Sequence, residues 1–161
     1  MRNGGGFSVQ VDSIRPAARA IAVRDGSIDT VVAHSFAFSN AFHQHKNAEA
    51  GGLLETCLSY SAHAPASMRE ALMSDAAVFQ ARRCKRVDLA EQWLADIPGT
   101  AELRWIRLRA EAAILEARGN LQGALGKLEE CEQAVDALTN VSRREYVLRL
   151  LERWKSELRS V

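Results

Sequence analysis

Residues 103–138 read LRWIRLRAEAAILEARGNLQGALGKLEECEQAVDAL, and their pattern of apolar residues decides the fold. Over residues 103–117 the apolar side chains form two stripes at three- to four-residue spacing. Two stripes predict a helix with neighbours on two sides, such as an inner helix of a layered stack. Gly119 then interrupts the pattern, and residues 121–138 carry one apolar stripe opposite a charged face. The stretch therefore predicts two packed helices joined by a tight turn.

A shift of about 34 residues brings the chain into register with itself. Ala90 then falls on Ala124, and Leu94 falls on Leu128. Small residues recur where two helices must approach closely, and larger apolar residues recur where helices interlock. We therefore expect Ala112 and Ala124, the small residues of the second copy, to be closely packed between helices.

The second copy carries small residues at the positions that define a known helical unit. Ala112, Gly119 and Ala124 match the small eighth residue, the glycine before the second helix and the small residue near its start. On these residues the chain resembles the tetratricopeptide repeat, a helix-turn-helix unit. The earlier copy departs from the pattern at the first two positions, and leucine replaces most of the expected aromatic residues. The resemblance covers residues 67–138 and implies an all-α, right-handed solenoid of stacked antiparallel helix pairs, with about seven helices.

Signals for helix starts and stops divide the remainder of the chain. Ser67 and Ser142 each precede a glutamate by three residues, which is the capping-box pattern. Pro98 ends the helix before it. We expect a flexible N-terminal segment over residues 1–11 and one helical-repeat domain over residues 12–161. Its clearest units span residues 67–98 and 103–138, followed by a capping helix over residues 142–160.

A second resemblance follows the order of several short segments. The chain reads DTVVAHSFAF from Asp29, GGLLE from Gly51, MREAL from Met68 and LAEQWL from Leu89. This order resembles the helical cytosolic tail that follows the membrane part of some bacterial site-2-protease-like metalloproteases. Those enzymes need a His-Glu-x-x-His helix and membrane spans, and this sequence has neither. The resemblance therefore implies a detached or paralogous regulatory tail that lacks the protease centre.

Charge and cysteine content exclude several classes of protein. Lys and Arg number 21 and Asp and Glu number 20, which gives a net charge of +1 and no global field for nucleic acid or anionic lipid. No stretch approaches the roughly 20 apolar residues that span a bilayer. Cys57, Cys84 and Cys131 lie far apart among apolar neighbours, which is typical of small core residues in a reducing compartment. Without a secretory signal at the N-terminus, we expect a cytoplasmic protein.

Two groups of residues have side chains suited to chemistry. His43, His45 and Glu49 are of metal-ligand type, but histidines two apart point about 200° from each other on a helix. We therefore interpret them as a polar helix end. Cys84 stands between Arg83 and Lys85, but no base or oxyanion site accompanies it. We expect no enzyme activity: no catalytic residue, no metal and no cofactor.

The basic run over residues 82–86 has two interpretations. It could contact phosphates, yet it also falls at a predicted helix C-terminus, where cations favour the dipole. No aromatic residues interleave with it, so we expect Arg82, Arg83, Lys85 and Arg86 to be solvated. By contrast, Trp105 and Trp154 lie on apolar stripes and should be buried.

Stacked helix pairs create a concave surface, and such surfaces recognise protein or peptide segments. Polar residues on the first helix of each pair are not needed for apolar packing, so they are candidates for partner contact: Gln80, Arg104, Arg107 and Glu111. A plain solubilising role for them stays open. We therefore expect a non-catalytic scaffold that binds a protein or peptide, and homodimer formation is left open.

Overall fold

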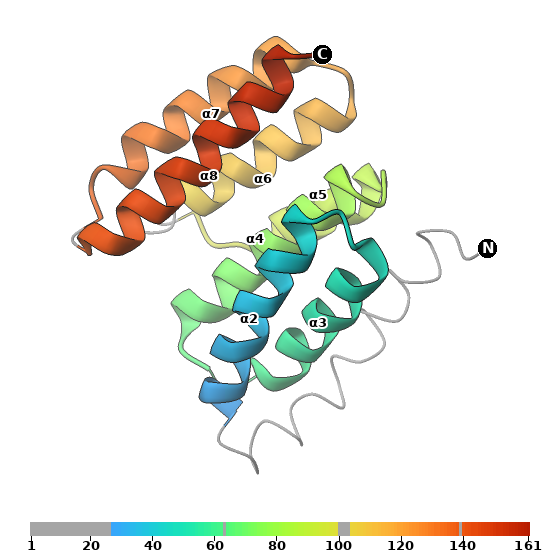
Figure 1. Ribbon diagram of the computed structural model, residues 1–161, viewed down its shortest axis with the longest axis vertical. Helices are drawn as coiled ribbons and strands as arrows, with labels where there is room; N and C mark the ends of the chain where they lie inside the picture. Colours follow the sequence, from blue (N-terminus) through green and yellow to red (C-terminus); the bar gives the residue numbers. More distant parts are fainter. Residues whose placement is uncertain (1–26, 63, 100–103, 139) are drawn as a thin grey trace.

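A computed structural model describes residues 27–62, 64–99, 104–138 and 140–161, with side chains from residue 31 onward. These residues form seven α-helices and no strand (Figure 1), which confirms the prediction of an all-helical chain. The helices are α2 (Ser27–His43), α3 (Asn47–Tyr60), α4 (Ala66–Arg82), α5 (Val87–Ala95), α6 (Arg104–Ala117), α7 (Leu121–Val135) and α8 (Val141–Arg159). The predicted segment over residues 1–11 and Leu103 lie outside the described residues. Within the described part, no helix is both long and apolar enough to cross a membrane.

Helices that follow each other in sequence pack against each other. The most extensive contacts join α6 with α7 and α2 with α3, followed by those of α4 with α6 and of α4 with α5. Figure 1 shows α8 running beside α6 and α7. Because α6 has α4 on one side and α7 on another, the prediction from its two apolar stripes is confirmed.

Small residues allow these close contacts. Ala112 on α6 and Ala124 on α7 have no exposed surface, which confirms their predicted burial. Trp105 and Trp154 are also buried, as predicted. A sulfur-containing side chain ties the same pair of helices, because the Cys131 thiol donates to the Trp105 carbonyl oxygen over 3.2 Å.

The turns between α2 and α3, α4 and α5, and α6 and α7 each contain a residue in the left-handed conformation. His45, Lys85 and Gly119 follow α2, α4 and α6, and each has a positive φ, of 57°, 58° and 82° respectively. A left-handed residue just after a helix lets the next amide groups bond back to its last carbonyls. The Lys46 amide accordingly bonds to the Ala41 carbonyl, and the corresponding groups after the other two helices do likewise. Only one of the three positions is glycine, the residue that adopts this conformation without steric cost.

The contact at Ala124 can be tested by enlarging the side chain. Replacing Ala124 with Leu inserts three carbon atoms into a site with no free surface, so it should lower the free energy of unfolding by about 1–3 kcal/mol. Urea denaturation followed by circular dichroism measures this change. The matched control is Gln133→Leu, at an exposed position of the same helix. Equal denaturation midpoints for the two variants would contradict the close contact.

Candidate functional site

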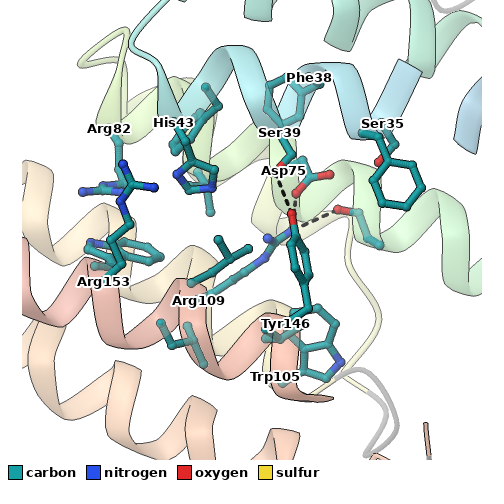
Figure 2. Close-up of a pocket in the computed structure, with 18 of the residues that line it drawn as sticks. Ser35, Phe38, Ser39, His43, Asp75, Arg82, Trp105, Arg109, Tyr146 and Arg153 are labelled. Atoms are coloured by element: carbon teal, nitrogen blue, oxygen red, sulfur yellow. Dashed lines mark hydrogen bonds and ion pairs between the residues drawn. The ribbon is translucent and has the colours of Figure 1, made fainter. Parts of the chain in front are cut away.

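Four helices surround one pocket of about 220 Å³ (Figure 2). Its walls come from α2, α4, α6 and α8, which are far apart in sequence. Six aromatic residues line it: Phe36, Phe38, Phe42, Trp105, Tyr146 and Trp154. The whole chain has five Phe, two Tyr and three Trp, so more than half of its aromatic residues meet at this pocket.

The aromatic residues divide into a buried floor and an exposed rim. Phe38, Phe42, Trp105 and Trp154 are buried, whereas Phe36 is 65% exposed and Tyr146 is 38% exposed. A second pocket of about 300 Å³ adjoins the first, since it shares Phe36 and other α2 and α4 residues, and it continues the apolar surface toward Val32.

One hydrogen bond bridges the first and last described helices. The Ser39 Oγ on α2 lies 3.0 Å from the Tyr146 hydroxyl on α8, and either group can donate. Figure 2 shows this bond at the pocket, with Ser39 and Asp75 close to the Tyr146 hydroxyl. The bond holds the Tyr146 side chain of α8 close to α2 at the pocket.

Arg109 of α6 connects this helix to α4 at the pocket. Its guanidinium donates to the Ser74 Oγ over 2.7 Å and forms an ion pair with Asp75. Ser74 in turn donates to the Ile106 carbonyl oxygen over 2.8 Å. The Arg109 guanidinium carbon also lies 5.4 Å from the centre of the Trp105 ring. The charge of Asp75 is therefore already compensated within the protein.

Arg82 is bound by two carboxylates and a tryptophan, so the prediction that it is solvated is wrong. Its guanidinium donates to Glu116 over 2.9 Å and to Glu157 over 2.8 Å, and its side chain is only 7% exposed. The same guanidinium lies 4.3 Å from the centre of the Trp154 ring, and the Trp154 indole donates to Glu116 over 2.7 Å. Partial burial would raise the pKa of Glu157, but the hydrogen bond and charge of Arg82 hold it below its usual value.

Arg83 is also bound within the protein, which corrects the second part of the same prediction. Its guanidinium lies 4.0 Å from the centre of the Phe42 ring and donates to the Phe42 carbonyl oxygen over 3.2 Å. Burial, followed by the charge of Arg82, lowers the pKa of Arg83. The rest of the run lies at the surface: Lys85 is exposed, as predicted, and Arg86 pairs with exposed Asp88.

His43 lines the pocket in the last turn of α2. Its ring lies edge-on to Phe42, with 5.3 Å between ring centres. Burial lowers the pKa of His43, and the charges of Arg153, Arg83 and Arg82 lower it further, whereas Glu157 opposes them. His45 and Glu49 are exposed, so His43 faces a different environment from these two. Within the described chain no group of three or more His, Cys, Asp or Glu residues could hold a metal ion.

All three cysteines are free thiols. Burial raises the pKa of Cys57 and of Cys131 to about 12. Burial likewise raises the pKa of Cys84 to about 11, although Arg86 acts in the opposite direction. Since the thiolate is the reactive form of cysteine, these groups lack the activation that a nucleophile near neutral pH requires.

The four residues predicted to contact a partner lie outside the pocket. Gln80 is only 1% exposed, so the expectation that it faces solvent is wrong. Arg107 donates to the carbonyl oxygens of Leu94 and Ile97 and thereby completes the end of α5, so it has a packing role. Arg104 is exposed, and Glu111 pairs with Lys127 over 3.1 Å. The expected contact surface therefore differs from the pocket that the structure forms.

Comparisons of this chain with protein-family models, with curated proteins and with solved structures found no match. The resemblances to the tetratricopeptide repeat and to the protease tail therefore stay predictions. We infer function from the pocket itself, because a fold alone does not determine function.

Removing the Arg82 guanidinium should destabilise the protein. Arg82→Gln leaves Glu116 and Glu157 without their shared cation, and we expect a loss of about 2–3 kcal/mol in the free energy of unfolding. Urea denaturation measures it. Arg86→Gln is the control in the same basic run, because its pair with Asp88 lies at the surface, and its midpoint should stay near that of the parent. The interpretation fails if both variants unfold at the same urea concentration.

His43 should make stability depend on pH. Its pKa in the folded chain lies below the ordinary value of about 6.5, so the fold favours the neutral imidazole. Below that pH the unfolded chain binds more protons, and stability is lost as the pH falls through the folded pKa. Unfolding by urea at several pH values should show less of this loss in His43→Gln than in the parent. The control is His45→Gln, at an exposed position, which should lose stability with falling pH as the parent does. A titration midpoint of His43 above about pH 6.5, measured by proton NMR, would contradict the argument.

Proposed function

We propose that this chain is a non-catalytic, tetratricopeptide-like scaffold that binds a protein or peptide segment in the pocket between α2, α4, α6 and α8. The observation that carries the proposal is the gathering of six aromatic residues at one pocket, two of them on an exposed rim. Aromatic side chains dominate the binding energy of many protein interfaces, because they bury much area with little loss of conformational freedom.

The proposed architecture accounts for the composition of the pocket walls. We take α2–α3, α4–α5 and α6–α7 as antiparallel pairs of a right-handed solenoid, and α8 as its capping helix. The pocket is then lined by the first helix of each pair and by the cap. Stacked repeats of this kind present such a concave surface to their partners. The left-handed residue that ends the first helix of each pair supports this assignment.

The polar groups of the pocket support binding rather than catalysis. Asp75 is held by Arg109, and Glu157 is held by Arg82. Both contacts fix the walls, and neither leaves a carboxylate placed to act as a base. The three free thiols fit a reducing compartment, so we place the scaffold in the cytoplasm as part of the same proposal.

Phe36 provides the test. Selection of displayed random peptides on the immobilised chain should yield binders, and Phe36→Ser should weaken them by about tenfold, as loss of an interfacial aromatic anchor does. The folded state should tolerate the change within about 0.5 kcal/mol, because the side chain is mostly exposed. Val161→Ser, at an exposed apolar residue outside the pocket, is the control and should bind as the parent does. Failure to select any peptide, or selected peptides that bind Phe36→Ser as tightly, would reject the proposal.

A further inference from the structure

The charges around the pocket are not balanced. Four arginines line it, namely Arg82, Arg109, Arg143 and Arg153. The acidic residues of the lining are only Asp75 and Glu157. Glu116 lies outside the lining but pairs with Arg82, so four positive charges face three negative ones and an excess of one positive charge is left. The pocket therefore concentrates positive charge beside its aromatic rim.

The two acidic residues are already used by the two inner arginines. Asp75 pairs with Arg109, and Glu157 accepts a hydrogen bond from Arg82 over 2.8 Å. Arg153 reaches only the other oxygen of Glu157, at 3.8 Å, and its side chain is 58% exposed. The excess charge thus resides on the outer arginines, which belong to α8.

Arg143 is the second outer arginine. It is exposed in the first turn of α8, and it lines both adjoining pockets. Its backbone amide is capped by Asn140, but no ion pair to its side chain occurs within the described part of the chain. A guanidinium at the edge of an apolar pocket is suited to bind a carboxylate in two-pronged geometry.

We propose that the bound segment is an acidic peptide with one large apolar side chain, whose carboxylates pair with Arg143 and Arg153 while the apolar group packs between Phe36 and Tyr146. This inference rests on the proposed function and adds the chemistry of the partner to it. Ten residues of α8 separate the two arginines, which is about 15 Å along the helix. An extended peptide covers that distance in about four or five residues. The acidic residues should therefore flank the apolar one at that spacing.

A nucleic acid fits these observations less well. Its phosphates would need a continuous row of cations, but the outer charge consists of two arginines on either side of an apolar rim. An acidic peptide uses both features, because its anchor covers Phe36 and Tyr146 while its carboxylates reach the arginines. Competition by a single-stranded oligonucleotide is therefore an arm of the test below.

His43 supplies a second readout. The charged groups that face it are Arg153 and Glu157 from α8 and Arg82 and Arg83 from α4. A carboxylate that arrives at Arg153 offsets this positive surrounding, so the complex should bind a proton more readily at His43 than the free protein does. Affinity for an acidic peptide should therefore rise as the pH falls from about 8 to about 6.

The test uses random peptides selected on the intact chain and then measured individually by fluorescence anisotropy. The expected binders carry Asp or Glu on both sides of one Leu, Phe or Trp, and replacing their acids by Asn or Gln should weaken binding by about tenfold. In Arg143→Gln and in Arg153→Gln, replacing the acidic residues of the peptide should weaken binding less than it does in the parent. Arg149→Gln, at an exposed position of the same helix outside the pocket, should leave it intact. His43→Gln should abolish the rise in affinity at lower pH.

The outcomes separate this inference from the proposed function. Basic or neutral binders that depend on Phe36 would overturn the inference and leave the scaffold function standing. Acidic binders that need no apolar residue, or that an oligonucleotide displaces with equal affinity, would show a general anion surface and also overturn the inference. If no peptide is enriched at all, both proposals fall together.

Discussion

The buried Arg82 guanidinium joins three of the four helices that line the pocket. A guanidinium that is shielded from water must be compensated by nearby negative charge, because the desolvation of an isolated cation is unfavourable. Here the two compensating carboxylates, Glu116 and Glu157, come from α6 and α8, and the Trp154 ring covers the cation. One side chain of α4 therefore joins α6 and α8, two of the other walls of the pocket, while α8 also packs against α7.

The pocket combines a fixed base with an open edge. Arg109, Ser74 and Asp75 connect α4 to α6 by a chain of polar contacts, and Arg109 and Asp75 line the pocket themselves. The edge, by contrast, consists of α2 and α8, which are joined there by the hydrogen bond between Ser39 and Tyr146. Preorganised walls reduce the entropy lost on binding, since few side chains need to be ordered when a partner arrives.

Local patterns in the sequence predicted the helices well and the pocket poorly. The two stripes of α6 and the buried alanines at 112 and 124 follow from periodicity, because helix packing repeats over three or four residues. Arg82 was misjudged because its partner Glu157 lies 75 residues further along the chain, beyond any local pattern. Gln80 was placed at the surface for its polarity, although α4 buries every residue from Ala76 to Ala81. The position of Tyr146 beside α2 could not be predicted for the same reason, since its hydrogen-bond partner Ser39 is 107 residues away in the sequence.

The three chain reversals with positive φ have a consequence for how such proteins are recognised. Two of them use His45 and Lys85, residues for which this backbone conformation costs about 1–2 kcal/mol relative to glycine. Two of the three turns therefore adopt the left-handed conformation without glycine, and the helices on either side of each turn pack against each other. A search pattern built on glycine at this position would find the turn at Gly119 and overlook the other two. The same left-handed turn is therefore formed here by three different residue types.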